Sequence, residues 1–121
     1  MPNTLENPLA HLRQIVRDFA AERDWDQFHT PKNLASALSV EAAELLEIFQ
    51  WLKTGEAVEL MPEQQQHAQQ EMADVLLYLV RLADRLGIDL YQAALEKVEI
   101  NRLKYPAEVV RGDARKSSEY E

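Results

Sequence analysis

Apolar residues recur at three- and four-residue steps along most of this chain, which is the spacing of an amphipathic helix. Residues that break helices are scarce, with 3 Gly and 5 Pro among 121 residues. No run of β-branched residues alternates with polar ones, as a half-buried strand requires. The sequence therefore predicts an all-α protein, a four-helix bundle with essentially no sheet.

Local start and stop signals divide the chain into these helices. Asn7 and Thr30 are N-cap residues, and each precedes a proline suited to the first helical position. Gly55 and Gly87 are stop signals, and Pro106 disfavours helical geometry in the residue before it. The predicted helices cover residues 8–23, 31–53, 62–86 and 90–105.

Length and composition limit the class of protein. A chain of this size forms one domain, which we expect at residues 1–111, followed by a polar, disordered tail at residues 112–121. The absence of Cys excludes disulfide scaffolds and cysteine–zinc sites. The N-terminus does not resemble a signal peptide, and the longest apolar stretch, residues 75–80, is far shorter than the roughly 20 residues of a membrane span. We therefore expect a cytoplasmic protein without a membrane partner.

The chain is acidic, with 21 Asp and Glu against 13 Lys and Arg and a formal net charge of −8. This balance argues against wrapping of a nucleic acid polymer, which depends on basic contacts to phosphates. A small anionic ligand would need a local positive patch or a metal ion.

Carboxylates occur where the second predicted helix should face the core. Glu41 falls within the apolar stripe of that helix, between Leu38 and Leu45, and Glu44 lies to one side of it. A carboxylate inside a bundle must be neutralised, paired or bound to a metal, because desolvation of an isolated charge is very costly. Glu41 and Glu44 are therefore candidate metal ligands.

The third predicted helix offers a matching pair, Glu71 and Asp74, at the margin of its own apolar stripe. If the two helices pack antiparallel, four carboxylates converge, and they cannot all ionise without a cation. A site made only of oxygen ligands suits Mg²⁺ or Mn²⁺. The alternative is that each pair is surface decoration, since Glu at positions i and i+3 is common on solvated helices.

The fourth predicted helix carries Lys97, Asn101 and Lys104 on one face, at steps of four and three. Beside a metal cluster, these side chains would hold the phosphate oxygens of a nucleoside triphosphate. The alternative is that the two lysines only balance nearby acidic residues and the C-terminus of the helix.

Four ordered stretches of this sequence resemble the all-α nucleoside triphosphate pyrophosphohydrolases of the MazG type, and within them the dCTP pyrophosphatases. The resemblance covers about residues 8–111, and its stretches are WDQFHTPKNL (25–34), EAAELLEIFQW (41–51), EMADVLLYL (71–79) and KVEINRLKYP (97–106). It implies a four-helix unit that works as a homotetramer, a dimer of dimers, with sites at subunit contacts.

The resemblance also implies roles for individual residues. Mg²⁺ would be held by Glu41, Glu44, Glu71 and Asp74. The phosphates or the sugar would be contacted by Lys97, Asn101 and Tyr105, and the nucleoside would be enclosed by His29, Trp51 and Tyr78. One position departs from the family, since Val40 stands where a first glutamate is common. If that glutamate activates water in other members of the family, then Glu44, Glu47 or a metal-bound hydroxide must activate water in this chain.

Several of these side chains have alternative roles. Trp51 and Tyr78 flank the acidic residues, which favours stacking on a base, although aromatic residues at helical spacing often belong to the core. His29 either takes part in function or bonds to the backbone of its loop. His67 either approaches the metal or is solvent-exposed. Trp25 and Phe28 either cover the base as a lid or pack on the end of the bundle.

Together with the carboxylate and lysine patterns, this resemblance implies Mg²⁺-dependent hydrolysis of a deoxynucleoside triphosphate, dCTP or a 5-modified dCTP, to the monophosphate and pyrophosphate. Two alternatives remain at this stage. One is another all-α pyrophosphatase that acts on dUTP or a different nucleotide. The other is a helical module for oligomerisation or metal binding that has no catalytic activity.

Overall fold

A computed structural model describes residues 7–120, and every helix and turn discussed below lies within them. The chain divides into two compact units, and the boundary along the sequence lies between Ile88 and Asp89. The first contains α1 (Pro8–Glu22), α2 (Pro31–Phe49), a 3-10 turn η1 (Ala57–Glu59) and α3 (Pro62–Leu86). The second contains α4 (Leu90–Lys104), α5 (Ala107–Val110) and a 3-10 turn η2 (Ser117–Tyr120). No strand occurs in this range, which confirms the predicted all-α class.

The N-caps of α1 and α2 are those that the sequence predicts. The Asn7 side chain accepts a hydrogen bond from the backbone N–H of Ala10, and Thr30 Oγ1 accepts one from Asn33, each at 3.2 Å. Asp89 caps α4 in the same way. At the end of α3, Gly87 adopts a left-handed conformation with φ of 68°, which glycine reaches without a steric penalty.

The second helix is shorter than predicted. It ends at Phe49, whereas the stop signal at Gly55 suggested an end near Lys53. The reason is a competing acceptor, because the Glu59 carboxylate accepts hydrogen bonds from the backbone N–H groups of Lys53, Thr54 and Gly55, at 2.9, 2.7 and 3.0 Å. These amides therefore bond to a side chain further along the chain instead of continuing the helix.

The fifth helix was not predicted. Pro106 ends α4 as expected, but it also occupies the N-cap position of α5 with φ of −60°, so that a new helical turn starts directly after it. The predicted count of four helices is therefore wrong by this short one. The predicted domain limit at residue 111 and the disordered tail stay predictions, although residues 117–120 form the turn η2.

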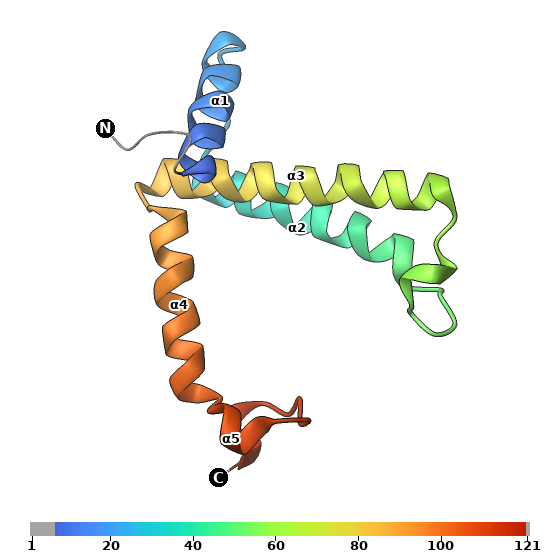
Figure 1. The fold of residues 1–121 in the computed structure, drawn as a ribbon. Coiled ribbons are helices and arrows are strands. Elements are labelled where there is room, and N and C mark those ends of the chain that lie inside the picture. Colours follow the sequence, from blue (N-terminus) through green and yellow to red (C-terminus); the bar gives the residue numbers. More distant parts are fainter. Residues whose placement is uncertain (1–6, 121) are drawn as a thin grey trace. The chain divides into compact units, whose positions relative to one another are not determined.

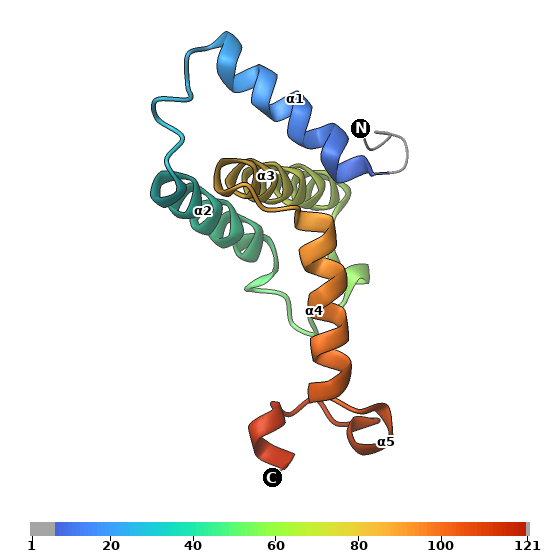
Figure 2. The same ribbon diagram turned by 90° about the vertical axis from the view of Figure 1, so that its left-hand side faces the viewer.

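In the first unit, α3 contacts both α2 and α1. Figures 1 and 2 show α2 running beside α3, while α1 lies on another side of α3, near its C-terminal end. The core between these helices is small and consists of Ala20, Leu34, Ala68, Val80 and Ala83. Within residues 7–120, no helix is both long enough and apolar enough to cross a membrane.

Candidate active site

The paired helices α2 and α3 bring three carboxylates together. Glu41 and Glu44 lie on α2 and Glu71 on α3, and each offers an oxygen atom so that all three atoms lie within 4.8 Å of one another. We call these residues the acidic triad. The convergence of carboxylates that the two helical patterns predicted is therefore present for three of the four residues.

The electrostatics of the triad reflect this crowding. The pKa of Glu41 is raised to about 7, first by the neighbouring Glu71 carboxyl, then by burial, and further by Glu44 and Asp74. One oxygen of Glu41 and one of Glu71, both Oε2, are buried and have no hydrogen-bond partner in the described chain. Buried oxygens of this kind are costly unless a donor or a cation reaches them. The donor set and its unmet oxygens fit a hard divalent cation, so the triad could bind a metal ion.

Asp74, the fourth predicted ligand, lies one turn after Glu71 on α3 and outside the triad. It is close enough to contribute to the raised pKa of Glu41. Its side chain also lines a pocket, described next, so Asp74 lies between the acidic triad and that pocket. His67, one turn before Glu71, is largely exposed, and its Nε2 atom lies 3.2 Å from Glu71 Oε1.

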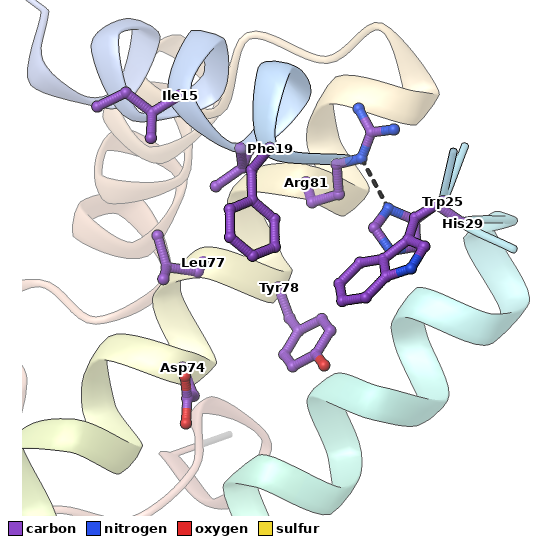
Figure 3. Close-up of a pocket in the computed structure, with 9 residues that line it drawn as sticks. Ile15, Phe19, Trp25, His29, Asp74, Leu77, Tyr78 and Arg81 are labelled. Carbon is purple, nitrogen blue, oxygen red and sulfur yellow. Dashed lines mark hydrogen bonds between the residues drawn. The ribbon is translucent and has the colours of Figure 1, made fainter. Parts of the chain in front are cut away.

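A pocket of about 290 Å³ opens beside Asp74, between α1, α3 and the segment that joins α1 to α2. Figure 3 shows Asp74, Tyr78 and Arg81 from α3 on one side and Trp25 and His29 from the connecting segment on another. The complete lining consists of Ile15, Val16, Phe19, Trp25, His29, Asp74, Leu77, Tyr78 and Arg81. A mostly apolar pocket with a few polar groups is the usual form of a small-molecule site.

The aromatic residues of the pocket hold one another in place. The rings of Phe19 and Trp25 meet edge to face with centroids 5.7 Å apart, and those of Trp25 and His29 with centroids 6.1 Å apart. Trp25 lines this pocket, whereas Phe28 is exposed and does not. Of the residues expected to enclose a nucleoside, the structure brings His29 and Tyr78 together.

Trp51 does not join them. It follows α2, is 85% exposed, and lines a second depression of about 390 Å³ with Glu47, Ile48, Leu52, Gln64 and His67. Because α2 ends at Phe49, Trp51 lies beyond the helix at the end away from His29. Glu47 lines this second depression and is not part of the acidic triad.

The basic face of the fourth predicted helix belongs to the second unit. Lys97, Asn101 and Lys104 lie on α4 and are exposed, and the ammonium of Lys104 lies 5.8 Å from the ring centroid of Tyr105. Glu99 pairs with Arg102 at 2.7 Å, and Glu96 accepts a hydrogen bond from Gln92, so neither of these contacts involves a lysine. The roles of these four residues toward phosphates stay predictions.

Arg81 was missed by the sequence analysis. It is only 4% exposed, and its guanidinium contacts Asp26, Asp84 and His29. Asp84 is paired with both Arg17 and Arg81; burial raises its pKa, but the two arginines outweigh this effect and lower it. Helical spacing could have indicated Arg81 as a site residue. It follows Asp74 by seven residues and Tyr78 by three, which places all three on one face of α3.

The chain is similar to known proteins of one family. Residues 36–119 match the MazG-like family, and the chain belongs to this family. The human dCTP pyrophosphatase 1 is 47% identical over 116 residues, covering 94% of this chain and 68% of the human protein. The mouse dCTP pyrophosphatase 1 is 46% identical, covering 90% of this chain and 65% of its own length. This chain thus spans about two thirds of the length of these relatives.

A solved structure has the same fold. The crystal structure of a pyrophosphatase from Archaeoglobus fulgidus superposes with a TM-score of 0.76 at 42% sequence identity. The match covers 83% of this chain and 94% of the archaeal one.

Proposed function

We propose that this protein hydrolyses a deoxynucleoside triphosphate, dCTP or a 5-modified dCTP, to the monophosphate and pyrophosphate in a Mg²⁺-dependent reaction. The observation that carries the proposal is the acidic triad, with two buried and unpartnered carboxylate oxygens, near an apolar pocket lined by Asp74, whose charge contributes to the raised pKa of Glu41. The mammalian relatives named dCTP pyrophosphatase 1 support the choice of substrate.

In this proposal the carboxylates bind the triphosphate end of the substrate through the metal, and the pocket binds the nucleobase. Glu41, Glu44, Glu71 and Asp74 hold Mg²⁺, which when bound neutralises phosphate charge and favours attack of water on phosphorus. The base enters the pocket, where Tyr78 and Trp25 present ring surfaces and His29 a polar group. The apolar lining excludes water from the base and orients the triphosphate toward the carboxylates.

The catalytic base, which accepts a proton from the attacking water, is one of the carboxylates of this chain. Val40 is 56% exposed, so the position of the first family glutamate lies at the surface of this unit. Glu44 belongs to the acidic triad, whereas Glu47 lines the other depression. This placement favours Glu44 as the group that accepts the proton of the attacking water.

The remaining predicted residues take roles that fit their chemistry. Lys97, Asn101, Lys104 and Tyr105 contact the phosphates or the sugar. Trp51 covers a nucleoside at a contact between subunits of a homotetramer, a dimer of dimers. Its 85% exposure supports this role, as does the exposure of Leu46, Val58 and Met61, since such apolar surface favours assembly. We retain the cytoplasmic location as a prediction.

The experiment is a measurement of pyrophosphate release from canonical and 5-modified nucleoside triphosphates, with Mg²⁺ and with EDTA. We expect release that needs the metal and is fastest for dCTP or its 5-modified forms. A preference for dUTP would instead identify another pyrophosphatase of the same class. Absence of release from every triphosphate by folded protein would overturn the proposal.

A matched pair of variants connects the activity to the site. Asp74→Asn should abolish turnover and weaken metal binding without unfolding the helices. Glu63→Gln makes a similar change at an exposed position in the first turn of α3 and should leave turnover unchanged. Equal activity of the two variants would contradict the assignment of Asp74.

A further inference from the structure

Arg81 is a buried charge with no part in the function proposed above. Its Nε atom donates a hydrogen bond to Nδ1 of His29 at 3.0 Å, and one of its terminal nitrogens donates to Asp84 at 2.8 Å. The other terminal nitrogen donates to Asp26. The guanidinium therefore connects α3 to the segment between α1 and α2, and one of its bonds ends on an imidazole ring.

That bond fixes the protonation of the imidazole. Arginine remains protonated in proteins and its N–H groups can only donate, so Nδ1 of His29 must accept. A neutral histidine that accepts at Nδ1 carries its proton on Nε2. The contact with Arg81 thus selects one of the two neutral tautomers and disfavours the doubly protonated ring.

The nitrogen that keeps the proton belongs to a residue that lines the pocket. Figure 3 shows the hydrogen bond from Arg81 on one edge of the His29 ring, and the Trp25 ring meets the same imidazole edge to face. Nε2 lies on the opposite edge of the ring, and it has no hydrogen-bond partner among residues 7–120. The pocket therefore contains an imidazole N–H that no described group of the protein uses.

We propose that Arg81 is a positioning residue that fixes the Nε2–H tautomer of His29, so that the pocket offers a hydrogen-bond donor to an acceptor on the edge of the bound base. That the ligand is a nucleobase rests on the proposed function. The assignment of the tautomer rests only on the hydrogen bond from Arg81. In cytosine the atoms O2 and N3 are both acceptors and suit such a donor. The other tautomer would present a lone pair to those atoms and repel them.

The charges around His29 agree with a neutral ring. Its pKa is lowered, first by burial, then by Arg81 and to a smaller degree by Arg85, while Asp26 acts in the opposite direction. From α3, Asp74 and Tyr78 also line the pocket. A donor that stays neutral distinguishes acceptor atoms by direction, without attracting every anion as a charged ring would.

Arg85 provides a matched control. It lies one turn after Arg81, and its Nε donates to the backbone oxygen of His29 at 3.1 Å. It therefore holds the same segment without contact to the ring nitrogens. Arg81→Met removes the bonds to the ring and to Asp26 and leaves Asp84 paired with Arg17, whereas Arg85→Met removes the bond to the His29 backbone and no bond to the ring.

The direct test is a two-bond ¹H–¹⁵N correlation spectrum of the histidine rings near pH 7, assigned with a His29→Gln variant. In the unmodified protein we expect His29 protonated at Nε2 and not at Nδ1. Arg81→Met, and Arg81→Lys, whose single ammonium cannot reproduce three contacts, should mix the tautomers, while Arg85→Met should not. A proton on Nδ1, or spectra that Arg81→Met leaves unchanged, would overturn the proposal. This readout needs no substrate and stands even if no triphosphate is hydrolysed.

The consequence for recognition is tested by kinetics. Arg81→Met should raise the KM for dCTP about twofold, because an even mixture of tautomers leaves about half of the rings able to donate, with a much smaller change in kcat. His29→Ala removes the imidazole, so this background has no tautomer for Arg81 to select. Arg81→Met added to that background should therefore leave the KM unchanged. An equal rise in KM in both backgrounds would show that Arg81 does not act through His29.

Discussion

Glu41 and Glu71 come from different helices, yet each buries one carboxylate oxygen, Oε2, that finds no hydrogen-bond donor in the described chain. The Glu71 carboxyl is also the first cause of the raised pKa of Glu41. The fold therefore carries an unfavourable interaction at the place where the proposed cation binds.

The first prediction concerns the response of stability to metal. Mg²⁺ should raise the melting temperature of the unmodified protein, because a ligand that binds only the folded state stabilises it. Glu71→Gln should raise the melting temperature in EDTA by about 2–5 °C and remove most of the response to Mg²⁺. Differential scanning calorimetry in EDTA and in Mg²⁺ measures both effects. A lower melting temperature for Glu71→Gln in EDTA would contradict the proposed repulsion.

The second prediction concerns pH. The pKa of Glu41 is about 7 in the folded protein against an ordinary value of 4.5, so the folded state binds more protons between these values. Stability contributed by protonated Glu41 is complete below about pH 4.5 and is lost as the pH rises toward 7. Melting temperatures in EDTA should therefore fall over this interval relative to those of Glu41→Gln, which lacks the titrating group. Parallel curves for the two proteins would contradict the assigned shift.

The third prediction concerns Asp84 and the two arginines, Arg17 and Arg81, that pair with it. Asp84→Ala removes a buried partner of buried Arg81 and should lower the free energy of unfolding by about 3 kcal/mol. Arg17→Ala removes a half-exposed partner of the same carboxylate and should cost no more than about 1 kcal/mol. Urea denaturation of the two variants makes the comparison. Similar losses would mean that exposure does not govern these contacts.

The fourth prediction concerns residues outside the pocket. Trp51→Ala should leave the melting temperature of a subunit nearly unchanged, because the side chain is 85% exposed, but should reduce discrimination among bases. Lys97→Ala should raise the KM for every triphosphate alike, because phosphate contacts carry no information about the base. The ratio of kcat/KM values for dCTP and dUTP distinguishes the two effects. Equal loss for all nucleotides in Trp51→Ala would argue against stacking.

The features that the sequence predicted correctly depend on local interactions. Asn7 and Thr30 cap helices through groups three residues away, so neighbouring letters suffice to identify them. Glu41 was found because helical periodicity assigns it to the apolar stripe, and its position near Glu71 then followed from packing of two adjacent helices. Such inferences need only the spacing of residues within one or two elements.

The features that were missed depend on contacts between distant parts of the chain. Arg81 meets His29 and Asp26, which lie 52 and 55 residues earlier, and no local pattern indicates that the turn after α1 folds onto α3. The end of α2 was misplaced for a related reason, since Glu59 attracts amides that lie before it in the chain. A glycine signal at residue 55 cannot reveal that competition.

The loop closed by Glu59 also has a kinetic consequence. A single carboxylate holds the amides of Lys53, Thr54 and Gly55, although all three lie at the surface. Its pKa is lowered to about 2, chiefly by the Thr54 hydroxyl, so the carboxylate remains ionised at neutral pH. Hydrogen exchange should therefore be slow at three neighbouring amides of an exposed loop, and these amides should lose their protection together when the one side chain is replaced.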